Sequence, residues 1–151
     1  MSNPPDVYLG LDVGDVRIGL AISRSGIISE PLVTITRTDK RQVLDDLQRV
    51  VEQNRVTVCV VGLPRLTGGD EGNQAEKTRA FIRSLQRRIP KVRYVFEDER
   101  FTSSEARDLI GGGRASKKGE LDRVAAAIIL QQYLDRLASE RPSTTQQPEG
   151  A

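Results

Sequence analysis

Short apolar runs separated by turn residues open the chain. The run Val7–Val13 is apolar except for Asp12, and Val16–Ser23 repeats the pattern after a tight Gly-Asp turn. A third run, Ile27–Thr36, contains Pro31, which suits a strand at a sheet edge because proline cannot donate a ladder hydrogen bond. Because the connections are short, these runs predict an antiparallel meander of three strands.

The rest of the chain alternates helical and strand patterns. Asp39–Asn54 carries apolar side chains at helical spacing, and Val56–Gly62 is a β-branched run typical of a strand buried on both faces. A glycine-rich segment then opens a second helix, Val92–Phe96 predicts a fifth strand, and Gly119–Ala138 predicts the last helix. The order β-β-β-α-β-α-β-α predicts an α/β fold. Its mixed five-stranded sheet has the first strand in a central place and helices on both faces.

One domain accounts for most of the chain. At 151 residues with 37% hydrophobic and 29% charged residues, the sequence is that of an ordinary globular domain. We expect residues 1–139 to form it, and residues 140–151, which are polar with two prolines, to be a disordered tail. A capping-box sequence at Thr102–Glu105 predicts one more short helix through Ile110.

The cysteine and histidine content excludes several kinds of chemistry. With Cys59 as the single cysteine and no histidine, the chain has no Cys/His zinc site, no internal disulfide and no Ser-His or Cys-His catalysis. Cys59 lies within an apolar run and is expected in the core. No stretch of ~20 apolar residues and no signal-peptide core is present, which predicts a cytoplasmic protein without a membrane partner.

Carboxylates from distant parts of the sequence are expected at one edge of the sheet. Asp12 is the only charge on the first strand, Glu97–Glu99 follows the fifth strand, and Asp122 opens the apolar face of the last helix. Two simpler explanations stay open. Asp12 could make turn hydrogen bonds at the end of its strand, and Asp122 could interact with the positive end of the helix dipole.

Clustered carboxylates repel one another unless a counter-charge joins them. Mg²⁺ or Mn²⁺ suits such a cluster, because hard divalent ions take carboxylate oxygens and keep waters and phosphates as further ligands. Two ions ~4 Å apart can promote phosphodiester hydrolysis. The glycine-rich segment Gly62–Ala75 fits either an anion site at a strand end or a plain crossover loop.

Four stretches resemble, in the same order, motifs of the YqgF (RuvX) proteins within residues 7–138. They are Leu9–Gly14 with Arg17–Ala21, Val61–Pro64 with the glycine-rich loop, Asp98–Ser103, and Asp122–Ala126. The resemblance implies an RNase H-like fold related to Holliday-junction resolvases. It also implies a role as a nuclease that matures the 5′ end of pre-16S ribosomal RNA.

The same resemblance implies roles for single residues. Asp12, Glu99 and Asp122 would be the catalytic acids that bind metal, and Asp98 competes with Glu99 because strand alternation lets only one of them face the ion. Glu97 is outside the motif and is interpreted as accessory or incidental. The cations expected to bind nucleic acid are Arg17, Arg100, Arg114, Lys117 and Lys118.

The substrate is open between structured RNA and branched DNA. A Holliday-junction resolvase or another DNA nuclease would use the same acids, and a resolvase needs a symmetric dimer, so monomer and homodimer both remain. From another class, a phosphate-loop nucleotide-binding protein of the actin and sugar-kinase type also begins like Leu11–Gly14, but its architecture needs two such domains. A non-catalytic nucleic-acid adaptor would not need three convergent acids.

Overall fold

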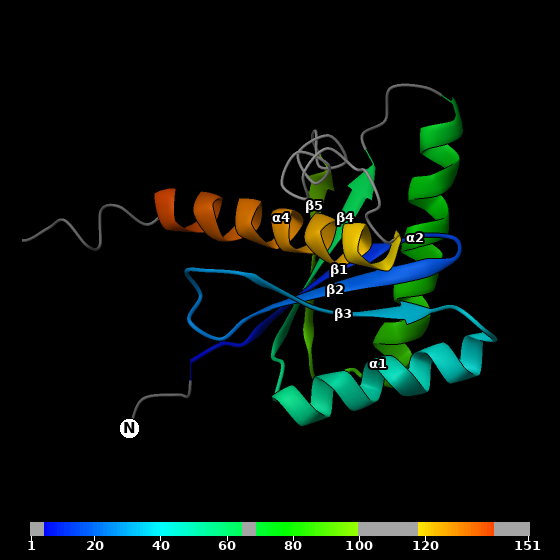
Figure 1. Cartoon of the computed structure of the whole chain (residues 1–151), viewed down its shortest axis with the longest axis horizontal. Helices are drawn as coiled ribbons and strands as arrows, with labels where there is room; N and C mark the ends of the chain where they lie inside the picture. Colours follow the sequence, from blue (N-terminus) through cyan, green and yellow to red (C-terminus); the bar gives the residue numbers. More distant parts are fainter. Residues whose placement is uncertain (1–4, 65–68, 100–117, 141–151) are drawn as a thin grey trace, which may run out of the picture.

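A five-stranded mixed sheet forms the centre of the molecule (Figure 1). The structure is a computed structural model that describes residues 5–64, 69–99 and 118–140. The strand order is β3-β2-β1-β4-β5, with β1 antiparallel to β2 and parallel to β4. The predicted meander, the parallel crossovers and the central first strand are therefore confirmed. The strands are β1 (Tyr8–Val13), β2 (Arg17–Ser23), β3 (Glu30–Thr36), β4 (Val58–Pro64) and β5 (Arg93–Glu99).

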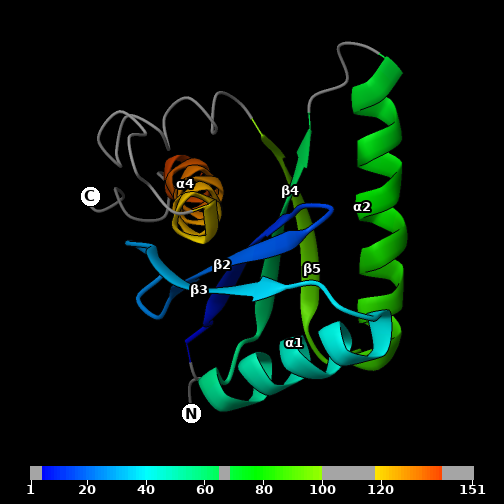
Figure 2. The same cartoon turned by 45° about the vertical axis from the view of Figure 1, so that its right-hand side comes forward.

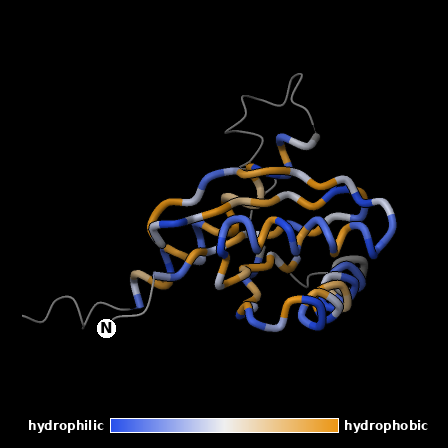
Figure 3. Tube along the Cα trace, turned by 90° about the horizontal axis from the view of Figure 1, so that it is seen from below, coloured by the Kyte–Doolittle hydropathy of each residue, from blue (hydrophilic) through white to orange (hydrophobic). Residues whose placement is uncertain are grey.

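Helices cover both faces of this sheet (Figure 2). Helices α1 (Lys40–Asn54) and α2 (Gly69–Arg88) pack against one face, and α4 (Lys118–Ser139) packs against the other. Polar and apolar positions alternate along the helices (Figure 3), as expected of elements with one buried side. The short helix predicted through Ile110 lies outside the described residues, and so does the predicted tail except for Glu140.

The start of β3 and the end of β5 differ most from the sequence-based prediction, and β4 runs from Val58 to Pro64 where Val56–Gly62 was predicted. β3 begins at Glu30 because the hydroxyl of Ser25 accepts hydrogen bonds from the backbone amides of Ile27 and Ile28, at 3.0 and 3.2 Å, which holds them in a turn. Pro31 does lie on an edge strand, as predicted. β5 continues through Glu99, because its last residues still pair with the end of β4.

The larger of two cores lies between the sheet and helices α1 and α2. Leu9, Leu11 and Val13 of β1 enter this core, whereas Tyr8 of the same strand packs against α4. This alternation is the physical basis for assigning each β1 side chain to a face. In the described part of the chain, no helix combines the length and the apolar character needed to cross a bilayer.

Cys59 is fully buried in the larger core, as predicted, and burial raises the pKa of its thiol from 9.0 to about 12. We expect the native protein to resist a thiol reagent such as dithionitrobenzoate at pH 8, because the reactive thiolate is absent there. Denaturant should make the same thiol react stoichiometrically. Rapid labelling of the native protein would contradict this, whereas slow labelling at the rate of unfolding would give a convenient test of folding for the variants below.

Candidate functional site

Asp12 lies on the face of the sheet that α4 covers. Its strand neighbours Leu11 and Val13 point into the core under α1 and α2, and Tyr8 points toward α4. Because side chains alternate along a strand, Asp12 shares the face of Tyr8. The residue is half-buried. A carboxylate is therefore held between the central strand and the last helix, where it is only partly solvated.

Two glycines bring the backbone of α4 directly onto the sheet. A Cβ at Gly19 would lie 2.0 Å from the carbonyl oxygen of Asp122, and one at Gly10 would lie 2.9 Å from the carbonyl oxygen of Ala126. Gly19 is also the residue paired with Asp12 across β1 and β2. The backbone of α4 therefore lies directly against the sheet, and Asp122 is brought to the strand position beside Asp12.

The two strand glycines that make this contact possible, Gly10 and Gly19, were not used in the sequence-based prediction. Both interrupt apolar strands, and an isolated glycine within a strand often marks a close approach of another backbone. That signal was available in the sequence to locate the contact.

Arg17 forms an ion pair with Asp122 across the same contact. Its Nε lies 2.7 Å from Oδ2 of the carboxylate, and the two side chains are 28% and 25% exposed. Glu120, not Asp122, is the acid in the first turn of α4. A guanidinium partner therefore explains Asp122 better than the helix dipole does, and Arg17 lies beside this acid.

We expect Arg17→Gln and Asp122→Asn each to destabilise the metal-free protein by roughly 1 kcal/mol, or about 2–4 °C in Tm, because each leaves a partly buried charge without its partner. The double variant should lose less stability than the sum of the two single losses, because the second change removes the charge that the first leaves unpaired. Thermal unfolding of the four proteins in chelator measures this. Additive losses would mean that the pair contributes nothing.

Glu97 proves to be a structural residue. It is buried on the α4 face of β5 and forms an ion pair with Arg136 of α4. This hydrogen bond raises the pKa of Arg136, whose guanidinium carbon also lies 5.6 Å from the centroid of the Tyr133 ring. The pair fastens the last helix to β5. Arg136 follows Asp122 by about four helical turns, which puts both on the side that faces the sheet.

Asp98 lies on the other face of β5. Tyr94 packs against the core under α1 and α2, and Phe96 lies beneath Arg79 of α2, with 5.3 Å between the guanidinium carbon and the ring centroid. By strand alternation Asp98 belongs with these two residues. The structure therefore does not bring Asp98 to Asp12 and Asp122.

Several predicted site residues lie wholly or partly outside the described part of the chain. The backbone of Glu99 pairs with Pro64 at the end of β5, and that of Lys118 begins α4, but their side chains are not described. Within the described residues, no three carboxylates come together as a metal site. Of the predicted acids, the structure brings Asp122 beside the strand position of Asp12. Outside the described residues lie Arg100, Arg114 and Lys117.

The fold defines the class of protein. The chain is similar to Thermus thermophilus RuvC in complex with a Holliday junction substrate, with a TM-score of 0.59 and 12% identity over 89% of this chain and 98% of that one. It is also similar to the fowlpox virus resolvase bound to Holliday junction DNA, with a TM-score of 0.54 and 12% identity over 87% and 98% of the two chains. The fold is thus the RNase H-like fold of the resolvases.

Sequence comparison identifies the family. The family model described as "RuvX: Holliday junction resolvase" matches residues 6–136. A protein of Fusobacterium nucleatum is 41% identical over 133 residues, covering 85% of this chain and 96% of the relative. One of Sulfurihydrogenibium is 38% identical over 139 residues, covering 90% and 94%. Both are named "Putative pre-16S rRNA nuclease". The chain belongs to the RuvX family, which confirms the resemblance and places it among the hydrolytic nucleases.

Proposed function

We propose that this protein is a divalent-metal-dependent nuclease that processes the 5′ end of pre-16S rRNA. The observation that carries the proposal is the meeting of Asp12 and Asp122, which the glycine contact between α4 and the sheet brings about. The name shared by relatives about 40% identical supports the substrate. Because the predicted substrate is ribosomal RNA, we expect a cytoplasmic protein.

Asp12, Asp122 and Glu99 are the proposed metal ligands. Strand alternation gives position 99 the same side of β5 as Val95 and Glu97, which is the α4 side. Carboxylate oxygens are the donors that Mg²⁺ and Mn²⁺ prefer, so the donor set fits either ion. When bound, such an ion lowers the pKa of water and polarises the phosphodiester.

The protein's own contribution is placement and charge. Arg17 holds the Asp122 carboxylate in place before metal and substrate arrive, because its Nε lies 2.7 Å from Oδ2 of that carboxylate. A guanidinium there can also contact a phosphate oxygen of the substrate. The Glu97–Arg136 pair fixes β5 two residues before Glu99. We propose that Arg100, Arg114, Lys117 and Lys118 bind the flanking phosphates.

Holliday-junction resolution is the second candidate. The matching family model carries that description, and the two structural neighbours were solved with junction DNA. A junction has two symmetric strands to cut, so this function requires a homodimer, whereas RNA processing is open to a monomer.

The deciding experiment gives the purified protein end-labelled pre-16S rRNA and a labelled four-way DNA junction at matched salt, with Mn²⁺, Mg²⁺ or chelator. We expect metal-dependent cleavage of the RNA near the mature 5′ end. Symmetric nicking of the junction with intact RNA would favour the resolvase. Calorimetric titration with Mn²⁺ gives a second readout, and failure to bind metal or to cut either substrate would overturn the proposed nuclease.

A further inference from the structure

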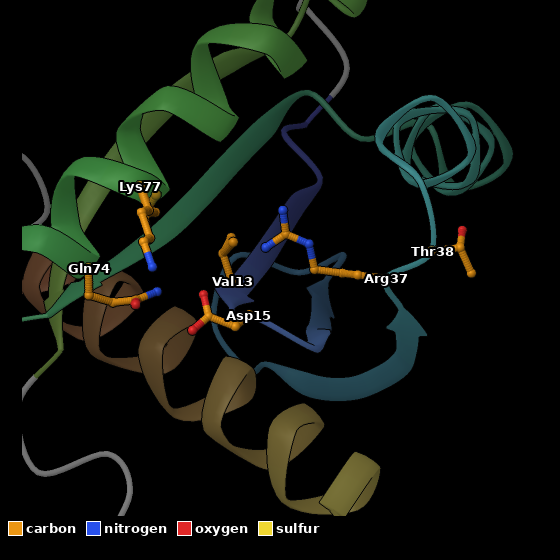
Figure 4. A pocket seen from close by; sticks show the side chains of 7 residues that line it. Val13, Asp15, Arg37, Thr38, Gln74 and Lys77 are labelled. Carbon is orange, nitrogen blue, oxygen red and sulfur yellow. The ribbon is translucent and has the colours of Figure 1, made fainter.

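A polar cavity of about 350 Å³ opens at the carboxyl edge of the sheet, on the side of α2. In Figure 4, Lys77 and Gln74 reach from α2 toward Val13 and Asp15, and Arg37 reaches in from the connection between β3 and α1. Val13 ends β1, directly after Asp12. The cavity therefore lies at the same edge as the two acids but on the opposite face of the sheet.

The cations around this cavity are not neutralised by their neighbours. Arg37 is held in place: its Nη1 donates to the carbonyl of Gly14 at 2.7 Å, and its guanidinium lies 4.9 Å from the centroid of the Phe81 ring. Lys77 forms no ion pair within the described part of the chain, and one carboxylate, Asp15, lines the cavity. A fixed guanidinium beside an unpaired ammonium favours an anionic ligand.

A buried hydroxyl also lines this cavity. Thr78 lines the cavity, is only 2% exposed, and finds no hydrogen-bond partner among the described residues. A buried polar group without a partner is costly, and such groups are rare unless a water or a ligand completes them. An anion in the cavity would accept the hydrogen bond that Thr78 can donate.

A second hollow of about 230 Å³ shares Arg37, Thr38 and Lys77 with the first and is also lined by Lys40. Because the two hollows share these residues, we treat them as one groove, lined by the three cations Arg37, Lys40 and Lys77. Three cations suit a chain of phosphates better than a single small anion. We propose that this groove binds the phosphodiester backbone of the nucleic-acid substrate, beyond the strand position of the acids. The identity of that ligand rests on the proposed function, whereas the anion site rests on the groove itself.

Binding without cleavage tests the groove. Anisotropy of a labelled single-stranded RNA in chelator, measured across salt concentrations, gives an affinity and a salt slope. We expect the double variant Lys40→Gln/Lys77→Gln to bind about tenfold more weakly and to flatten the slope by about 1.4, since each lost phosphate contact on a single strand removes about 0.7.

The matched control is Arg83→Gln/Lys91→Gln, which removes the same charge from exposed residues outside the groove. It should leave the salt slope unchanged. If the two double variants have equal effects, overall charge explains the result and the groove proposal is wrong. Inorganic phosphate provides the other arm: if calorimetry shows that the groove variant loses phosphate binding while RNA binding is unaffected, the site takes a free anion and the backbone proposal is wrong.

Thr78→Val separates a ligand-binding role from a structural one. If the hydroxyl awaits a ligand, the variant keeps or raises the Tm of the free protein and weakens RNA binding about two- to tenfold. A lower Tm with unchanged binding would contradict the inference. The outcome is independent of catalysis. If RNA binding depends on the groove but the protein cuts nothing, the groove proposal stands and the proposed nuclease function fails. If the protein cuts RNA but the groove variant keeps the wild-type salt slope, the nuclease function stands and the groove proposal fails.

Discussion

Asp12→Asn is expected to reduce RNA cleavage by about a thousandfold or more while the protein keeps its fold. The exchange preserves the shape of the side chain and removes the charge that would bind the metal, and a loss of ~4 kcal/mol in transition-state stabilisation corresponds to that factor. Initial rates with excess Mn²⁺ measure the loss. Resistance of the Cys59 thiol to labelling shows that the variant is folded.

Asp98→Asn is the matched control at the end of β5, and Glu99→Gln tests the third proposed ligand. The register places Asp98 on the α2 face, so its amide variant should cleave at close to the normal rate, while Glu99→Gln should resemble Asp12→Asn. The reverse result would reassign the third ligand to Asp98. Full activity of a folded Asp12→Asn protein would remove the metal assignment altogether.

Gly19→Ala is expected to damage stability and activity together. The new Cβ would lie 2.0 Å from the carbonyl oxygen of Asp122, and backbone cannot turn aside as a side chain can. Overpacking at such a contact costs about 3 kcal/mol, or roughly 6–12 °C in Tm, and displaces the start of α4. Cleavage should fall even below the new Tm, because Asp122 moves away from Asp12.

Gly119→Ala is the control for this variant. The atoms nearest to its Cβ would be those of Thr34, at an ordinary contact distance of 3.6 Å, and alanine favours helix, so the change should be neutral or slightly stabilising. Thermal unfolding and cleavage rates of the two variants decide. A Gly19→Ala protein as stable and active as the Gly119→Ala protein would show that the helix and sheet are not in backbone contact there.

The fold was largely predictable because its signals are local. Apolar alternation gave the strands, Pro31 marked the edge strand, and the spacing of apolar residues in Asp39–Asn54 gave α1, whose N-cap Asp39 accepts a hydrogen bond from the amide of Gln42 at 2.9 Å. The start of β3 was missed because the Ser25 hydroxyl competes for backbone amides, an effect that hydrophobic periodicity does not register.

The site was predictable only in part, because it depends on contacts between distant elements. Sequence spacing indicated that Asp12 and Asp122 would share an edge, but not that Arg17 would lie between strand and helix as the partner of Asp122. The role of Glu97 depends on Arg136, which lies in another element and became its partner only through the packing of α4. The groove likewise combines residues of three separate segments.

The long separation between the two halves of the site has a consequence for the protein's synthesis. Arg17 and Asp122 are 105 residues apart, and at about 5–20 residues per second the ribosome takes roughly 5–20 s to pass from one to the other. During that time the hairpins of β1, β2 and β3 can form, but no acid from α4 is present. The proposed catalytic centre is thus complete only once nearly the whole chain has emerged. For most of that synthesis, a ribosome making this protein therefore carries a nascent chain whose proposed catalytic centre is still incomplete.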